Sequence, residues 1–209
     1  MSEDAQARPT RSYHHGNLRA ELLEQAIEQL RSTPPEQLSL RAIARALGVS
    51  QTAPYRHFAD KEALLAALAA QGYEHLLGRL HGARARAGDV AADQLRAVAR
   101  AYVDFAAEES QLFKLMFGPL AQPSARHPEL REVSRETLYL VQAILAHGMQ
   151  RHEFRDQDAI YLANAAWAGI HGVATLRIDA PALFRTHIDL GHQVNVAVET
   201  FIAGISAEA

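Results

Sequence analysis

Apolar residues recur every three or four positions along almost the whole chain, and no segment alternates β-branched residues with the period of a strand. This period predicts an all-α fold. Asn17, Ser39, Ser50 and Asp60 are predicted N-caps of the first four helices. These helices are expected to cover 18 up to Pro34, 40–47, 51–58 and 61 to about 79 or beyond, with later helices at 90–108, 109–117, 128–152, 157–177 and 183–206.

The composition narrows the class of protein. A chain of 209 residues that is 48% apolar and 22% charged is long enough for a sizeable core, and no run approaches the roughly 18 apolar residues of a membrane span. The absence of cysteine excludes a disulfide framework, a thiolate nucleophile and cysteine-ligated metal sites. Residues 1–15 contain no apolar signal segment, so we expect a cytoplasmic location.

Eleven histidines raise the question of a metal site. His147 and His152, like His187 and His192, are five residues apart, which turns their rings away from each other on a helix. The sequence also contains no glycine-rich phosphate loop and no nucleophile elbow. We therefore expect no metal, no cofactor and no enzymatic activity. A helical-bundle enzyme remains the alternative class, although the sequence offers almost no candidate catalytic residues for it.

Charge is distributed unevenly along the chain. The formal net charge is −3, yet residues 8–56 hold seven arginines against four glutamates and are therefore net positive. A basic N-terminal quarter favours a DNA-facing end, and the alternative is ordinary variation of surface charge.

Residues 39–58 have the spacing of a helix-turn-helix motif, with two short helices joined at Gly48. Ala44 is small where the helices would cross, and Val49 and Phe58 supply apolar anchors. In such a motif the second helix, about two turns long, places its N-terminal side chains on base edges in the major groove. From periodicity alone, an αα-hairpin of any helical protein is an equal alternative.

The motif closely resembles the TetR family of transcriptional regulators over residues 17–66. The family signature is present as Ile43-Ala44, Gly48-Val49-Ser50, Tyr55-Arg56-His57-Phe58 and Lys61-Glu62-Ala63-Leu64. Two features depart from the pattern. Pro34-Pro35 replaces a frequent glycine-aromatic turn, and Pro54 stands where small or aliphatic residues are usual.

The resemblance implies which residues contact DNA. Those expected to bind phosphates are Ser39, Arg41, Tyr55, His57 and Lys61. Gln51 and Thr52 are expected to read bases, since glutamine can pair with adenine and threonine can touch a thymine methyl. The alternatives are a solvated surface residue for Gln51 and a core aromatic with an exposed hydroxyl for Tyr55.

Residues 1–15 are expected to form a disordered arm. Its basic side chains could follow the adjacent minor groove, and the alternative is a solvated tail. They are Arg8, Arg11, His14 and His15.

The resemblance further divides the chain into a three-helix DNA-binding domain at 16–66 and a larger helical domain for ligand binding and dimerisation at 67–209. The helix at 157–177 is apolar on nearly every side. We assign its stripe of Ala159, Leu162, Ala166, Gly169, Val173 and Leu176 to a dimer interface. The second stripe, Ile160, Ala163, Trp167, Ile170 and Ala174, is assigned to the core. Val194, Val198, Phe201 and Ile205 of the last helix are expected at the same interface, and a core within one chain is the alternative.

The segment from Trp167 to Gly172 resembles the Trp-His-Gly signature of one C-terminal subtype of these regulators. Trp167 and His171 lie four residues apart on one helical face, so they could line a cavity as an aromatic wall and a polar handle. Other candidates for its lining are Phe105, Phe113, Met116, Phe117 and Tyr139. The alternative for each aromatic is plain core, and the partner of His171 could be a backbone carbonyl.

These observations predict a one-component transcriptional regulator, a repressor that binds a palindromic DNA operator as a homodimer and is released by a small-molecule effector. A DNA-binding protein without a ligand is the remaining alternative. It would require a smaller C-terminal half than the roughly 140 residues that follow the motif.

Overall fold

The computed structural model describes residues 17–207, and the basic residues predicted in the N-terminal arm lie outside that range. Helices dominate the described chain, and no strand occurs in it beyond two isolated bridges, which confirms the predicted all-α class. No helix in this range is long and apolar enough to cross a membrane. The helices are α1 (Leu18–Leu30), η1 (Pro35–Gln37), α2 (Leu40–Ala46), η2 (Ala53–Arg56), α3 (Lys61–Arg86), α4 (Ala91–Glu108), α5 (Ser110–Phe117), α6 (Pro128–Gln150), α7 (Ala159–Asp179), α8 (Pro181–Thr186) and α9 (Leu190–Ile205).

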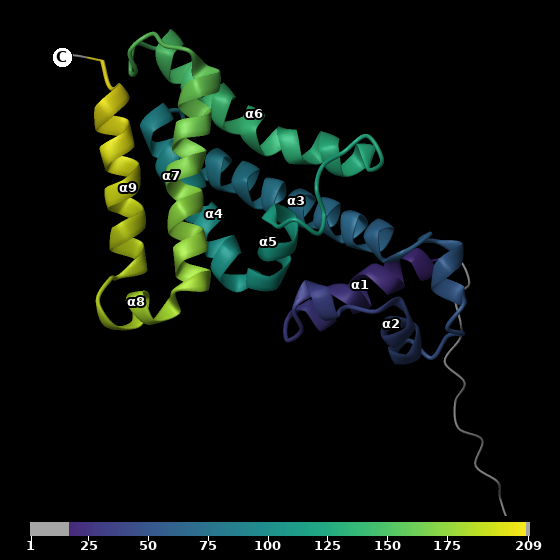
Figure 1. Ribbon diagram of the computed structural model, residues 1–209. Helices are drawn as coiled ribbons and strands as arrows, with labels where there is room; N and C mark the ends of the chain where they lie inside the picture. The colour runs from purple at the N-terminus through teal and green to yellow at the C-terminus, as the bar shows by residue number, and fades with distance from the viewer. Residues whose placement is uncertain (1–16, 208–209) are drawn as a thin grey trace, which may run out of the picture.

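The long helix α3 runs through both parts of the molecule (Figure 1). It begins where expected, because the Asp60 carboxylate accepts a hydrogen bond from the Ala63 backbone N–H at 2.8 Å. Its 26 residues extend about 39 Å at 1.5 Å per residue. Leu64 and Leu68 are buried near its N-terminus, where α3 packs on α1, and Leu76 and Leu80 are buried further along, where α4 and α6 cover it. The predicted domain division at 66 falls inside this continuous helix.

The second half of the chain is a bundle around α4. Helix α4 packs against α3, α6, α7 and α9, and Figure 1 shows α7 and α9 side by side with α8 at the turn between them. The C-terminal end of α9 is tied back to the loop before α7, because the Arg155 N–H donates to the Ile205 carbonyl at 2.8 Å.

The last predicted helix, 183–206, is divided in the structure. A short helix, α8, ends at Thr186, and α9 begins at Leu190 after Asp189. The Asp189 carboxylate accepts a hydrogen bond from the His192 N–H at 2.7 Å and starts a new helix at this point. This cap was not recognised in the sequence.

A close helix-to-loop contact at Gly148 of α6 supports the bundle. A methyl group added at Gly148 would overlap the ring of the buried Phe154 and lie 2.8 Å from the Ala91 side chain. The site therefore requires the absence of a side chain.

We expect Gly148→Ala to lower the free energy of unfolding by about 1 to 3 kcal/mol, since Phe154 must leave its packed position. Urea denaturation measures this change. Gly78→Ala in α3 is the matched control, because its added methyl meets no atom within 4 Å and should raise stability by about 0.5 to 1 kcal/mol. Equal effects of both substitutions would contradict the packing described for Gly148.

Candidate functional site

The first candidate site is the surface formed by α2, η2 and the turn between them. Ile43 and Ala44 of α2 are fully buried, which fixes the face that α2 presents to α1. The turn after α2 is closed by two hydrogen bonds, from the Gly48 N–H to Arg45 O and from the Val49 N–H to Ala44 O. Gly48 has φ +71°, a conformation that glycine adopts without strain.

The recognition element is shorter than the predicted two-turn helix at 51–58. The structure has a 3₁₀ helix at 53–56, preceded by a turn in which Ser50 Oγ accepts from the Thr52 N–H at 3.3 Å. Pro54 explains the difference, because proline has no N–H to donate to the Ser50 carbonyl four residues earlier. The Ala53 N–H donates to that carbonyl instead, at 2.9 Å. Asn17 and Ser39 stand at N-cap positions, but their side chains make no capping hydrogen bond.

The side chains predicted to contact DNA are mostly exposed on this surface. Arg41, Gln51, Thr52, Tyr55 and His57 are exposed, and Ser39 and Lys61 are partly buried.

Lys61 has a structural contact as well. Its ammonium group donates to the Glu36 carbonyl at 2.5 Å and thereby links the start of α3 to η1.

Arg45 and Arg56 were not predicted, although the sequence places both inside the motif. They are exposed, and neither forms an ion pair with another residue in 17–207.

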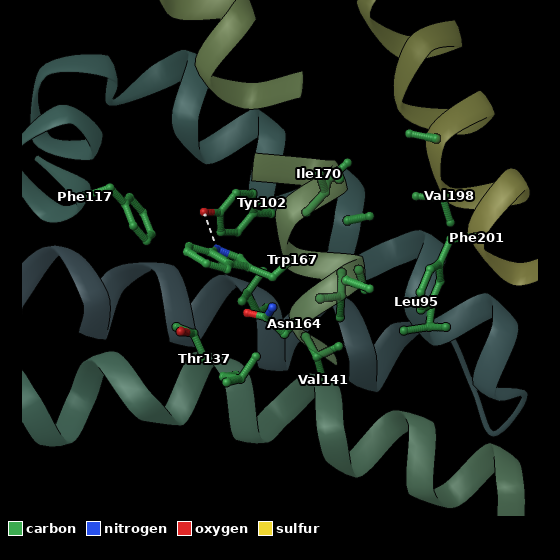
Figure 2. Close-up of a pocket in the computed structure, with 18 of the residues that line it drawn as sticks. Leu95, Tyr102, Phe117, Thr137, Val141, Asn164, Trp167, Ile170, Val198 and Phe201 are labelled. Carbon is green, nitrogen blue, oxygen red and sulfur yellow. Dashed lines mark hydrogen bonds between the residues drawn. The ribbon is translucent and has the colours of Figure 1, made fainter. Parts of the chain in front are cut away.

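The second candidate site is a cavity of about 330 Å³ in the bundle, lined from α3, α4, α5, α6, α7 and α9 (Figure 2). Most of its wall is aliphatic, with Leu95 and Val98 from α4 and Val198 from α9. The polar lining side chains are Tyr73, Tyr102, Ser134, Thr137, Asn164 and Trp167. A predominantly apolar cavity with a few polar groups is the usual form of a small-molecule site.

Hydrogen bonds through the Tyr102 hydroxyl of α4 connect Trp167 in the cavity wall with His171 behind it. The Trp167 indole N–H donates to the Tyr102 hydroxyl at 3.3 Å, the dashed line in Figure 2. Tyr102 in turn lies 2.9 Å from Nδ1 of His171. The Tyr102 hydroxyl donates to Nδ1 when the neutral imidazole carries its proton on Nε2, and it accepts from Nδ1–H in the other tautomer. The partner of His171 is therefore a phenol rather than a backbone carbonyl.

Aromatic rings surround this chain of hydrogen bonds. The His171 ring stacks on Phe113 with centroids 5.4 Å apart, and Phe117 approaches it edge-on at 4.7 Å. Burial raises the pKa of the Tyr102 hydroxyl, and it lowers the pKa of His171 because a charged imidazole would lose its hydration. Both groups are accordingly held in their neutral forms.

The residues predicted to line the cavity occupy different environments in the structure. Phe117 and Trp167 line the cavity, whereas Phe113 and His171 lie outside its lining and contact these rings. Met116 is buried against Gly72 of α3.

Phe105 and Tyr139 lie outside the cavity lining. Phe105 is buried near the Arg79 guanidinium, and Tyr139 is 49% exposed on α6. Their positions follow from the rotation of α4 and α6 in the bundle, which residue type alone does not determine.

Most of the lining was missed by the sequence reasoning, including the polar residues Tyr102, Asn164 and Thr137. Tyr102 stands three residues before Phe105 on α4, about one helical turn away, so helical geometry could have suggested it. Asn164 stands three residues before Trp167, on the same side of α7. Thr137 gave no signal in the sequence, because a threonine in a polar helix face resembles any solvated residue.

The stripes predicted on α7 differ from the observed faces. Val173, assigned to a dimer interface, is buried within the chain, and Ile160, assigned to the core, is 60% exposed. The small residues Ala163 and Ala174 are fully buried where α7 packs on its neighbours, and this close packing sets the rotation of α7.

The residues expected at an interface on α9 are also mostly internal. Val194, Val198 and Ile205 are buried against the chain's own helices, as the alternative interpretation held. The large apolar side chains that α7 and α9 expose are Ile160, Tyr161, Trp167, Leu176 and Val196.

The fold and the exposed motif define a DNA-binding regulator with a helix-turn-helix unit and a larger helical domain. Two family profiles match it: "Bacterial regulatory proteins, tetR family" over residues 22–68 and "Tetracyclin repressor-like, C-terminal domain" over residues 95–201. The second covers just over half of the chain. The chain belongs to the TetR family of transcriptional regulators, whose members are generally not enzymes.

Solved structures have the same fold. A protein of unknown function from Rhodococcus sp. RHA1 is 34% identical, with 94% of this chain and 100% of that chain covered and a TM-score of 0.84. A TetR family regulatory protein from Rhodococcus RHA1 is 23% identical, with 93% and 100% covered and a TM-score of 0.69. The regulator FadR from Bacillus subtilis, solved in complex with stearoyl-CoA, is 20% identical, with 90% and 99% covered and a TM-score of 0.73. No curated protein sequence matches the chain.

The lowered pKa of His171 predicts how stability depends on pH. The unfolded imidazole, with a pKa of about 6.5, takes up a proton before the folded one does, so stability falls as the pH drops from 7.5 to 5.5. We expect His171→Gln, which stays neutral, to reduce this loss in urea unfolding measured across that range. An unaltered slope in His171→Gln would assign the effect to other groups.

Proposed function

We propose that this protein is a ligand-responsive transcriptional repressor that binds a palindromic operator as a homodimer and is released from it by a small-molecule effector. The observation that carries the proposal is the continuity of α3. One helix begins at Lys61 beside the recognition element and supplies Tyr73 and Leu80 to the cavity wall. A ligand that alters the tilt of α3 would change the distance between the two recognition elements of a dimer.

DNA recognition is proposed to follow the predicted division of roles. Gln51 and Thr52 would read base edges, and Arg41, Tyr55 and His57 would bind phosphates. The exposure of these five side chains supports the proposal. Ser39 and Lys61 would also reach phosphates, with Lys61 doing so from the start of α3, beside η1. Arg45 and Arg56 add positive charge to the same region and are proposed as further phosphate contacts.

The homodimer is proposed to form through the outer faces of α7 and α9. Tyr161 is 76% exposed and Leu176 is 51% exposed on α7, and both would lose contact with water in a dimer. Burial of such side chains supplies the main favourable term of a permanent interface.

The cavity is proposed as the effector site, with 67–209 as the regulatory domain and 16–66 as the DNA-binding domain. Its apolar wall and convergent polar groups support this assignment. Phe117, Trp167 and Tyr102 would contact the effector. His171 and Phe113 would position these rings, and Met116 would hold α5 against α3. The arrangement of Trp167, His171 and Gly172 also supports membership of the Trp-His-Gly subtype.

Base reading by Gln51 can be tested by selecting bound duplexes from a random DNA library. The parent protein should select a palindrome with half-site centres roughly 34 to 36 Å apart. Gln51→Ala should relax the preference at one base pair in each half-site, at a cost of about 1 to 3 kcal/mol per site in binding. Gln150→Ala, an exposed glutamine at the end of α6, is the matched control and should select the parent sequence. Selection of no common sequence by the parent would refute operator binding.

The interface can be tested with two valines of equal exposure. Val196 on α9 is 45% exposed and Val90 before α4 is 46% exposed. Val196→Arg should convert dimers to monomers, because an unpaired charge at a close interface costs several kcal/mol, whereas Val90→Arg should stay dimeric. Sedimentation velocity at micromolar concentration measures the mass of each variant, and circular dichroism checks its helicity. A fully dimeric, helical Val196→Arg protein would place the interface elsewhere.

A further inference from the structure

The cavity wall carries no charged side chain in the described part of the chain. The helices around it have many charged residues, but these pair with one another elsewhere. Arg79 binds Glu108, Arg96 binds Glu199 and Lys114 binds Asp179, all at partly exposed positions. A ligand in the cavity would therefore find no counter-ion there.

The titratable groups at the cavity do not supply a charge either. Burial raises the pKa of Tyr73 and of Tyr102, so neither phenol ionises near neutral pH. His171, behind the wall, has its pKa lowered by burial, and its Nδ1 lies 2.9 Å from the Tyr102 hydroxyl. An ionised carboxylate or phosphate in the apolar, buried part of the cavity would lose hydration without compensation.

Most hydrogen-bond donors of the wall already have an acceptor. The Tyr73 hydroxyl donates to Met116 O at 3.1 Å, and the Trp167 indole donates to Tyr102. Ser134 and Thr137 donate to carbonyls of their own helix, Arg131 O at 3.1 Å and Ser134 O at 2.9 Å. Their oxygens retain lone pairs and face the cavity as acceptors.

Asn164 differs from the other polar lining residues. It is exposed to solvent at the edge of the cavity, its side chain has no hydrogen-bond partner among residues 17–207, and Figure 2 shows its amide directed to the same space as Thr137. The amide can donate two hydrogen bonds and accept at its oxygen. The wall thus presents several acceptors and one group that can both donate and accept.

We propose, resting on the proposed function, that the effector is an uncharged, largely apolar molecule with a hydroxyl group that binds at Asn164 and Thr137. The hydroxyl oxygen accepts from the Asn164 amide, and its hydrogen is donated to Thr137 Oγ1 or Asn164 Oδ1. An ether or ester can satisfy only the first of these bonds. A carboxylate, besides lacking a hydrogen to donate, brings a charge that the cavity does not neutralise.

The chain holds a single tryptophan, Trp167, in the cavity wall, so its fluorescence reports occupancy directly. We would titrate the full-length protein with 1-decanol, 1-methoxynonane, decanoate and decanoyl-CoA. The alcohol and the ether have the same number of non-hydrogen atoms and differ in the hydroxyl hydrogen. The ether should bind about threefold to tenfold more weakly than the alcohol, the effect of one hydrogen bond, and the two anions more than about tenfold more weakly.

Asn164→Leu tests the residue that carries the inference. This substitution keeps the size of the side chain and should bring 1-decanol to the affinity of 1-methoxynonane. Asn195→Leu is the matched control. Asn195 on α9 accepts a hydrogen bond from Arg100 of α4 and lies outside the cavity lining, so the preference for the alcohol should persist.

Three results would overturn the inference: equal affinity of parent protein for alcohol and ether, binding of either anion as tight as that of 1-decanol, or no fluorescence change with any probe. Fluorescence anisotropy of labelled operator DNA distinguishes failure of this inference from failure of the proposed function. Release by decanoate or decanoyl-CoA would reject the uncharged effector and retain the ligand-responsive regulator. Binding of 1-decanol without any change in operator affinity would count against effector release itself.

Discussion

The structure depends on one long helix, α3, which contributes buried residues to two separate cores. Leu64 and Leu68 pack in the DNA-binding unit, and Leu76 and Leu80 pack in the bundle, so each half of α3 completes a different core. A 26-residue helix that loses either contact would expose a long apolar face to water. The two cores are therefore coupled through their packing, and the hydrogen bond of Asp60 to Ala63 fixes where the shared helix begins.

The hydrogen bonds of Tyr102 make a similar connection within the bundle. Trp167 and His171 stand one turn apart on α7, and both bond to the single hydroxyl on α4. Removing that hydroxyl would leave an indole N–H and an imidazole nitrogen without their protein partners, a loss that costs more for the partly buried His171 than for the exposed Trp167. Because Phe113 and Phe117 of α5 pack on the same imidazole, the rotation of α7 is linked to the position of α5.

Local signals in the sequence were sufficient for the helices and for the turn of the motif. Gly48 after an apolar helical face and Asp60 before another one are short-range features, and both occur where predicted. The recognition element was misjudged because Pro54, which is compatible with the first turn of a helix, was not expected to shorten it. The predictions for Phe105, Tyr139 and the α7 stripes were wrong for another reason. Whether an aromatic faces a cavity depends on the rotation of its helix, and this rotation is set by contacts such as that of Ala163 and Ala174 with neighbouring helices.

The contacts between the two parts of the chain limit how an effector could act on DNA binding. Besides α3 itself, they include the packing of α5 against α1 and η1, the ion pair of Glu62 with Arg126 and a contact of Glu62 with the His127 ring at 3.2 Å. Exposed ion pairs of this kind contribute about 0 to 1 kcal/mol, so they can transmit little of a coupling of about 1 to 3 kcal/mol. The larger share must pass through α3 and α5. Both helices meet at the cavity, since Tyr73 and Phe117 line it and their rings are in edge contact at 5.4 Å. In the proposed mechanism, a molecule that separates these two rings moves two helices that pack against the DNA-binding unit.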